Sequence, residues 1–294
     1  MESIIWEGDA GNDPPELRSP IVIATFSGWN DAATSATMAL DAIAASLDSD
    51  AVARLDAEPF YDFQANRPTI RITSGELQGI IWPTNRVVTA RAAAASRDAI
   101  LIHGTEPSTH WRTYCEALLD IVERLDAQML ITLGALIADV SHTRPVPITG
   151  LASDAAAISN LGLDDVNFEG PTGITGVMHE TAKRRGLASA SLWAAIPHYA
   201  AAVPNPKAAL ALVRRVEGLT GIAIEAAGLE RSGERFVAQL DRAIAANPEI
   251  KELVAKLERQ QDETVDIAAE LPTGDAIASE IQRFLRRHDG DSAD

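Results

Sequence analysis

The stretch Ile21–Asp31 reads IVIATFSGWND, and the alanine-rich segment Ala32–Leu47 follows it. Its first six residues are apolar or β-branched, which is typical of a buried strand. The glycine and the polar residues after it predict a tight turn in which Asn30 or Asp31 caps a helix. The stretch therefore predicts a strand, a turn and a helix in succession.

Segments of the same two kinds alternate through most of the chain. Apolar residues recur at helical spacing between Trp111 and Leu125, which predicts an amphipathic helix. The Gly-rich stretch from Glu169 leads into a second helix that ends near Gly186. TIRIT at residues 69–73 alternates apolar and polar residues in the manner of a half-exposed strand. This alternation predicts a layered α/β domain with a largely parallel sheet. The other predicted strands are residues 51–55, 77–82, 99–102, 129–133, 145–149 and 189–193.

The character of the sequence changes after Pro204, because no strand is predicted beyond it. We therefore expect an α/β domain over residues 1–210, a small all-helical C-terminal region over 211–288, and a disordered tail over 289–294. The helices predicted in this part are residues 208–216, 222–246, 249–263 and 275–287.

The charge and composition of the chain argue against several classes of function. Its 294 residues carry 42 acidic and 25 basic side chains, a net charge of −17. Such a surface repels phosphate backbones and anionic membranes, so we expect neither nucleic-acid binding nor membrane insertion. No apolar run approaches the roughly 20 residues that cross a bilayer, and the first residues have no signal-peptide features. The single cysteine, Cys115, cannot form an internal disulfide, which fits a cytoplasmic protein.

Several enzyme signatures are absent from the sequence. It has no G-x-G-x-x-G after a strand, no phosphate-binding loop ending in GK[ST], no G-x-S-x-G turn and no HExxH. These absences count against dinucleotide, nucleoside-triphosphate and zinc-protease chemistry. We expect no cofactor and no metal, since Asp139 and His142 lie three residues apart but have no third ligand at a diagnostic spacing.

Polar and aromatic residues gather in the loops that follow the predicted strands, where an open α/β sheet forms its binding crevice. Glycines in these turns allow an anion to approach backbone N–H groups. Each group also has a purely structural reading: a turn and helix cap around Trp29, an ion pair of Glu106 with Arg112, and a plain turn at residues 169–173. The candidate ligand- or partner-binding residues are Trp29, Asn30, Asp31, Glu106, Arg112, Arg144, Glu169, Thr172 and His198.

Asp139 and His142 are weak candidates for acid–base catalysis. In this reading Arg144 holds an anionic group of a substrate, and His142 acts as general acid or base, oriented by Asp139. In the structural reading the same residues hold the loop together, and replacing His142 or Arg144 unfolds the protein.

Seven motifs occur in a fixed order between about Ile21 and Pro206. They are GWNDA, FYDFQANRP, WP, TEPS-HWR, LGAL-ADV-HTRPVP-TG, EGPTGI and SLWAA-PHY. In these motifs the sequence resembles the bacterial branch of the proteasome-assembly-chaperone family of the second-subunit type. The resemblance implies a nucleoside-phosphorylase-like fold, a three-layer α/β sandwich with a mixed, mostly parallel sheet. The chain departs from the expected pattern at Ser141, where a proline is expected, and in ATSATM after GWNDA.

The resemblance also implies a function. The eukaryotic relatives are chaperones that bind proteasome α subunits during ring assembly, and family members form homo-oligomers, trimers among them. We therefore expect a non-catalytic protein-binding or assembly factor, whose partners are itself and an unidentified protein. The alternative is a phosphorylase-like or hydrolase-like enzyme, or a small-molecule binder, with its site in the loops after the strands. A third reading assigns those loops to self-association alone, so the sequence leaves open whether the chain is an enzyme.

Overall fold

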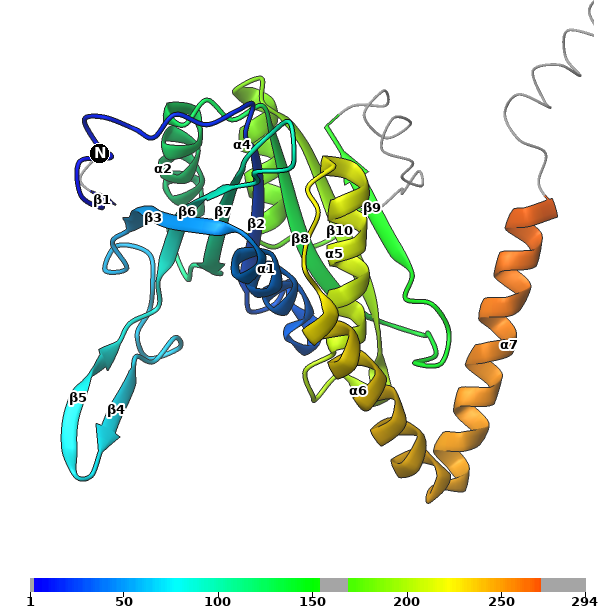
Figure 1. The fold of residues 1–294 in the computed structure, drawn as a ribbon. Helices are drawn as coiled ribbons and strands as arrows, with labels where there is room; N and C mark the ends of the chain where they lie inside the picture. Colours follow the sequence, from blue (N-terminus) through cyan, green and yellow to red (C-terminus); the bar gives the residue numbers. More distant parts are fainter. Residues whose placement is uncertain (1–2, 154–168, 271–294) are drawn as a thin grey trace, which may run out of the picture. The chain divides into compact units, whose positions relative to one another are not determined.

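The computed structural model describes residues 3–153 and 169–270 of the chain, which divides into two compact units (Figure 1). The first unit is Met1–Ala243 and the second is Ile244–Asp294. Sequence reasoning placed a boundary at residue 210, which lies within the helix α5 (Pro206–Thr220). The predicted helix at 275–287 and the predicted tail at 289–294 lie outside the described residues.

An eight-stranded mixed sheet forms the centre of the first unit, in the order β1-β3-β6-β7-β2-β8-β10-β9. The four neighbouring strands β7, β2, β8 and β10 run parallel, and the remaining strands join them antiparallel. The strands are β1 (Ile4–Trp6), β2 (Ile21–Ser27), β3 (Asp48–Leu55), β6 (Asn85–Arg91), β7 (Ala99–Thr105), β8 (Met129–Ala138), β9 (Ile148–Ala152) and β10 (Ala188–Pro197).

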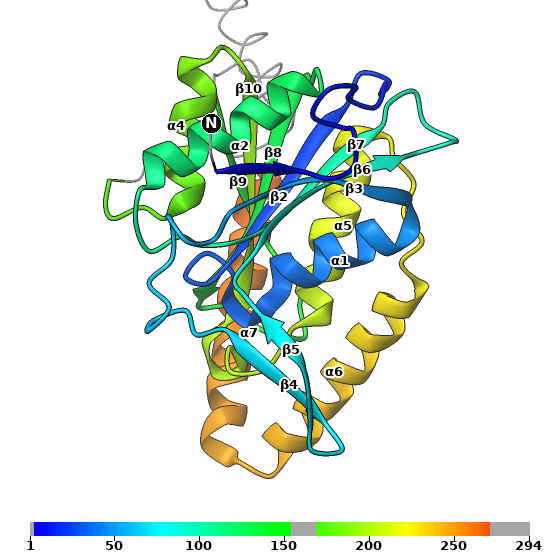
Figure 2. The same ribbon diagram turned by 90° about the vertical axis from the view of Figure 1, so that its left-hand side faces the viewer.

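Helices cover both faces of this sheet, so the unit is a three-layer α/β sandwich, which confirms the predicted fold class (Figures 1 and 2). The helices α1 and α5 pack on one face, and α2 and α4 pack on the other. The elements outside the sheet are η1 (Ala32–Thr34), α1 (Ser35–Ser46), α2 (Trp111–Arg124), α4 (Ile174–Arg184), η2 (His198–Ala200), α6 (Ala227–Ala245) and α7 (Pro248–Glu270). None of the helices in the described ranges combines the length and the hydropathy that crossing a bilayer requires.

The strand β2 is buried on both faces, which requires a layer of helices on each side of the sheet. Ile21 and Ile23 belong to the core beneath α1 and α5, whereas Val22 and Ala24 belong to the core beneath α2 and α4. A strand that is buried on both faces needs a continuous apolar run rather than an alternating one. IVIATF meets that requirement at the middle of the sheet.

The central strands β8 and β10 also approach closely at one point. Gly134 on β8 lies opposite Trp193 on β10, and a Cβ atom at Gly134 would lie 2.7 Å from the indole ring. Only a residue without a side chain allows the tryptophan to cover the strand here.

The strand expected at residues 145–149 is observed a few residues later as β9, at the edge of the sheet. Pro145 and Pro147 have no N–H to donate, so the ladder begins after them. The strands β1 and β6 were not expected from the sequence.

The strands β4 (Thr69–Thr73) and β5 (Glu76–Ile81) form a separate two-stranded hairpin. It projects away from the eight-stranded sheet in both views (Figures 1 and 2). The alternation of TIRIT predicts a strand with one buried face, but every residue of β4 is exposed. The strand is therefore correctly predicted, and its burial is not.

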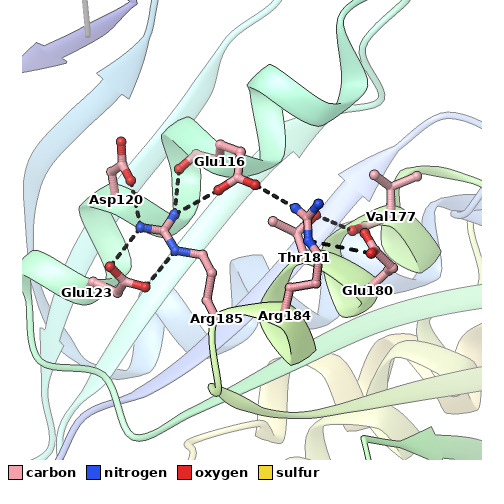
Figure 3. Close-up of polar contacts among 8 residues, drawn as sticks. All are labelled: Glu116, Asp120, Glu123, Val177, Glu180, Thr181, Arg184 and Arg185. Carbon is pink, nitrogen blue, oxygen red and sulfur yellow. Dashed lines mark hydrogen bonds and ion pairs between the residues drawn. The ribbon is translucent and has the colours of Figure 1, made fainter.

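An ion-pair network ties the end of α4 to the side of α2 (Figure 3). The Arg185 guanidinium lies 3.2 Å from Glu116, 2.7 Å from Asp120 and 2.6 Å from Glu123. These three carboxylates come from successive turns of α2, so the Arg185 guanidinium bridges one face of that helix and reduces the repulsion between its acidic side chains. The neighbouring Arg184 pairs with Glu116 at 2.5 Å and is more exposed than Arg185.

Candidate functional site

The carboxyl ends of the parallel strands β7, β2, β8 and β10 meet at one edge of the sheet, here called the carboxyl edge. The loops that follow these strands carry most of the residues that the sequence singles out, as expected for an α/β sheet. These residues fall into three groups: one around Glu106, one around His142, and a set of exposed side chains.

The Glu106 carboxylate joins three segments at the carboxyl edge. Its Oε1 accepts a hydrogen bond from Asn30 Nδ2 at 2.8 Å and one from the Ile174 backbone N–H at 2.9 Å. Asn30 is buried and also accepts from the Thr175 hydroxyl at 3.3 Å. A Cβ atom at Gly173 would lie 2.4 Å from the Asn30 amide, so this turn requires glycine. Two residues predicted from the sequence, Asn30 and Glu106, are therefore hydrogen-bonded to each other. Ile174 and Thr175 also belong to this group and were not predicted.

Asp31 lies before the short helix η1, and its side chain accepts hydrogen bonds from the first turn of α1. Its carboxylate accepts from the Ala36 N–H at 2.7 Å, the Thr37 N–H at 3.2 Å and the Thr37 hydroxyl at 2.6 Å. Burial of the group raises the pKa of Asp31, and these hydrogen bonds partly oppose that rise.

These contacts bear directly on anion binding at the carboxyl edge. A free helix N-terminus attracts an anion through its N–H groups and its dipole. At α1 the carboxylate of Asp31 already accepts the N–H groups of Ala36 and Thr37, and at α4 the carboxylate of Glu106 accepts that of Ile174. Each helix start therefore already has a carboxylate of the chain itself at its N–H groups.

His142 is buried and hydrogen-bonded through both ring nitrogens. Nδ1 lies 2.8 Å from the Tyr199 hydroxyl, and Nε2 lies 3.1 Å from Asp241 Oδ1 on α6. Tyr199 also accepts from the His142 backbone N–H at 2.9 Å. The expected pairing of His142 with Asp139 does not form, since Asp139 lies 3.4 Å from His198 instead. This arrangement holds the loop after β8 against η2 and α6.

Lys207 completes this second group from the first turn of α5. Its ammonium donates to the backbone carbonyls of His142 at 2.5 Å and Arg144 at 2.6 Å. Burial lowers the pKa of Lys207, and the nearby Asp241 opposes that fall. Asp241 lies 99 positions from His142, so no local pattern in the sequence connects them.

The remaining candidates are mostly on the surface. Trp29 is 67% exposed, so its indole does not pack over the sheet. Within the described residues no ion pair joins Arg112 to Glu106. Arg144 is half-buried; the other candidates are exposed, namely Arg112, Asp139, Glu169, Thr172 and His198.

A buried hydrogen-bond network of two tyrosines and Asn85 lies beside the carboxyl edge, next to the end of β7. Asn85 Oδ1 accepts from the Tyr114 hydroxyl at 2.6 Å and from the Thr105 N–H at 3.1 Å, and Asn85 Nδ2 donates to the Tyr61 hydroxyl at 2.7 Å. Burial raises the pKa of Tyr61 to about 12. The loop that carries Tyr61 contacts the next one through Ser108, which donates its N–H to Phe60 O at 2.8 Å.

A second buried polar cluster lies between α4 and the sheet. His179 Nε2 and Thr132 Oγ1 lie 2.9 Å apart, and Thr132 Oγ1 lies 2.7 Å from Ser191 Oγ. The other ring nitrogen of His179 has no partner among the described residues. Burial lowers the pKa of His179 to about 4.

The described residues offer little reactive chemistry. No group of three or more histidine, cysteine or acidic side chains among them is arranged to hold a metal ion. Cys115 is fully buried, and burial raises the pKa of its thiol to about 12. A thiol with such a pKa is a poor nucleophile near neutral pH.

The profile of the PAC2 family matches residues 25–244. Among solved structures, the proteasome-assembly chaperone homologue Rv2125 of Mycobacterium tuberculosis is 40% identical, covers 80% of this chain and 99% of its own, and superposes with a TM-score of 0.74. A PAC2 family protein from Streptomyces avermitilis is 39% identical with the same coverage and a TM-score of 0.75. A protein of unknown function from Corynebacterium glutamicum shares the fold at 22% identity, with a TM-score of 0.82 over 90% of this chain and 98% of its own. No curated protein matches the sequence.

Proposed function

Because this chain belongs to the PAC2 family, we propose that it is a non-catalytic, protein-binding assembly factor that works in the cytoplasm as a homo-oligomer, with three copies as the expected number. Its relative from Mycobacterium tuberculosis is described as a proteasome-assembly chaperone homologue, and the two sequences are 40% identical. We extend that description to this chain, so that unassembled proteasome α subunits become the first partner to test.

One observation carries the non-catalytic part of the proposal. The polar side chains that sequence reasoning offered for chemistry are used to hold the carboxyl edge together. Glu106 and Asp31 accept backbone N–H groups, and His142 is buried between Tyr199 and Asp241. A general base needs access to the proton that it takes from a substrate, and the contacts of His142 leave neither ring nitrogen open.

The exposed surface supports the protein-binding part. Contiguous exposed apolar side chains on a protein usually mark a contact with another molecule. The β4–β5 hairpin presents five such side chains, and Trp82 follows it directly.

The test combines a binding arm and a ligand arm, both with the full chain. In the binding arm, the protein is mixed with purified unassembled proteasome α subunits of the same organism and analysed by size exclusion with light scattering. A co-eluting complex of defined stoichiometry is expected. Independent elution of the two proteins at concentrations of tens of micromolar would contradict the proteasome assignment.

In the ligand arm, thermal unfolding is measured with nucleosides, phosphate, sugars, metal ions and acyl compounds. A specific ligand at about a hundred times its dissociation constant adds roughly 2.7 kcal/mol of stability. No such shift is expected. A reproducible shift that disappears in Arg144→Ala but persists in the exposed control Arg235→Ala would overturn the non-catalytic proposal in favour of a small-molecule site.

A further inference from the structure

A cavity of about 220 Å³ lies at the base of the β4–β5 hairpin, within the first unit. Its walls come from the end of β3, the loop that follows β3, and the segment between β5 and β6. Leu55 and Asn85 are opposed in the β3–β6 ladder, so these walls meet at the end of two paired strands. The cavity is here called the root pocket, and the lining side chains that decide its chemistry are Arg54, Asp56, Glu58, Phe63 and Trp82.

Two aromatic rings form one part of the root pocket. Phe63 and Trp82 pack edge to face with their ring centroids 4.8 Å apart, and Trp82 is 48% exposed. A cation within about 6 Å of a ring centroid is attracted by the electrons of the ring, most strongly at tryptophan. The chain makes this contact elsewhere, since the Arg124 guanidinium lies 5.5 Å from the centre of the Trp6 ring. No cation of the described residues lies over Trp82 in the same way.

Two carboxylates form the charged part of the root pocket. Asp56 Oδ1 accepts the backbone N–H of Glu58 at 3.2 Å, so one turn after β3 carries both acidic residues. Neither forms an ion pair within residues 3–153 and 169–270. The cation that lines the pocket, Arg54, has its Nε 3.3 Å from Glu7, which is not part of the lining. The two carboxylates therefore lie beside two aromatic rings with their charge uncompensated.

The walls of the root pocket are held in place by the fold. Phe60 and Tyr61 each donate their N–H to the Ala57 carbonyl, at 3.0 and 3.2 Å, which closes the turn beyond Glu58. The Tyr61 hydroxyl in turn accepts a hydrogen bond from the buried Asn85 at 2.7 Å. A site whose groups are fixed before binding loses less conformational entropy when its ligand arrives.

We infer that the root pocket binds one arginine side chain of a partner protein. A guanidinium stacks on an aromatic ring and also donates parallel hydrogen bonds to a carboxylate, whereas an ammonium is a compact and strongly hydrated charge. The size of the cavity favours a single side chain, because sites for whole small molecules measure about 300–1,000 Å³. The inference rests on the proposed protein-binding function and names the chemistry of one contact.

The charge of the chain also favours a basic partner. A net charge of −17 attracts a basic surface over a distance, and the root pocket then fixes one residue of that surface. Residues 1–2 and 154–168, which lie outside the described ranges, contain no arginine. The second unit contains four, and one of them is the alternative occupant that the test must separate from a partner. They are Arg259, Arg283, Arg286 and Arg287.

The first arm of the test titrates the full chain with N-acetyl-arginine amide and with its neutral isostere, N-acetyl-citrulline amide. NMR follows the indole N–H signals of the five tryptophans, and Trp82→Phe identifies the signal of Trp82. The arginine compound is expected to shift that signal with a dissociation constant on the order of 1–10 mM, and the citrulline compound is not. Equal shifts from the two compounds would contradict the inference, since charge would then play no part.

A pair of variants with the same change in net charge tests the two carboxylates. The pocket variant is Asp56→Asn with Glu58→Gln, which keeps the shape of both side chains. The control variant is Glu16→Gln with Glu76→Gln, at exposed positions outside the pocket. The pocket variant should bind the arginine compound roughly 10-fold more weakly, and the control should stay within about 2-fold of the wild type. Equal weakening in both variants would reduce the effect to long-range attraction and overturn the inference. Thermal unfolding verifies that each variant is folded.

The second arm replaces the four arginines of the second unit with glutamine. A response to the arginine compound in this variant but not in the wild type would show that the chain fills its own pocket, which overturns the assignment to a partner. No response of Trp82 in either protein would overturn the binding site itself.

The third arm measures the complex with proteasome α subunits by sedimentation velocity over a dilution series. The pocket variant is expected to bind the α subunits roughly 10-fold more weakly than the wild type and the control variant do. A complex of unchanged affinity would overturn the inference and leave the proposed function intact. The absence of any complex with the wild type would contradict the proteasome assignment, and the first two arms would still decide whether the pocket binds arginine.

Discussion

Glu106 Oε1 accepts a hydrogen bond of 2.9 Å from the backbone N–H of Ile174, 68 positions later in the chain. The contact places a negative charge at the first turn of α4 and links that helix to the loop after β7. Asn30 donates to the same oxygen, so a single carboxylate fixes three loops of the carboxyl edge. Replacing this glutamate should therefore lower the free energy of unfolding of the protein.

Glu106→Ala is expected to lower the free energy of unfolding by about 1–3 kcal/mol, because two donors lose their acceptor in a partly buried place. Glu106→Gln keeps an acceptor oxygen and loses only the charge at the helix start, so a loss of about 0.3–1 kcal/mol is expected. Urea unfolding near neutral pH measures both. Glu58→Ala, at an exposed glutamate, is the control and should change stability by less than about 0.5 kcal/mol. Equal stabilities of the Ala variant and the wild type would refute the structural role.

The α2–α4 network predicts a difference between two neighbouring arginines (Figure 3). Arg185 is 21% exposed and contacts three carboxylates, so Arg185→Ala leaves those carboxylates facing one another. We expect a loss of about 1–2 kcal/mol that shrinks in roughly 1 M salt, where repulsion between exposed charges is screened. Arg184→Ala, at the more exposed neighbour, should cost less than about 1 kcal/mol. Thermal unfolding at low and high salt compares the two, and identical losses would argue against the network.

The buried His179 predicts a stability that falls with acid. Its pKa is about 4 in the folded protein and about 6.5 in an unfolded chain, so the unfolded state binds the additional proton between these values. The free energy of unfolding should therefore decrease by up to about 1.4 kcal/mol for each pH unit from pH 6.5 down to about 4. His179→Gln cannot titrate there and should show a shallower slope in urea unfolding. Parallel slopes in the two proteins would show that His179 is not buried as a neutral base.

The close approach of β8 and β10 predicts opposite effects for two glycine substitutions. In Gly134→Ala the new methyl group would meet the Trp193 ring at 2.7 Å, and we expect a loss of about 1–3 kcal/mol from overpacking. In Gly218→Ala the methyl group meets no atom within 4 Å, and alanine is the better helix former in α5 by about 1 kcal/mol. Thermal unfolding of both variants should thus give shifts of opposite sign. A stable Gly134→Ala variant would mean that Trp193 can move aside.

The sequence predicts the fold well because local and global requirements agree in it. IVIATF is apolar on both faces, as a central strand must be, and the spacing between Trp111 and Leu125 matches the buried face of α2. The role of Asp31 near the start of α1 is predictable in part: its carboxylate does accept N–H groups of that helix, although the short helix η1 separates the two. These signals lie within short windows of sequence.

The site was harder to predict because its contacts cross long distances in the chain. The spacing of Asp139 and His142 suggested a pair, but the two side chains separate: His142 turns inward toward Tyr199 and Asp241, and Asp139 is 85% exposed on its side chain. No window of sequence contains both His142 and Asp241. The exposure of the β4–β5 hairpin could not be predicted either. Alternation of apolar and polar residues indicates that a strand has an apolar face, but it does not indicate what covers that face.

The position of β2 in the sheet has a consequence for how the protein is made. This strand is an apolar run and is synthesised before both of its neighbours, β7 and β8, which begin only at Ala99 and Met129. At translation speeds of about 5–20 residues per second, both of its edges stay unpaired for seconds while the intervening chain emerges. Apolar β-branched segments with open edges are the ones that aggregate. This member of the PAC2 family therefore contains a strand that itself needs protection while the rest of its sheet is synthesised.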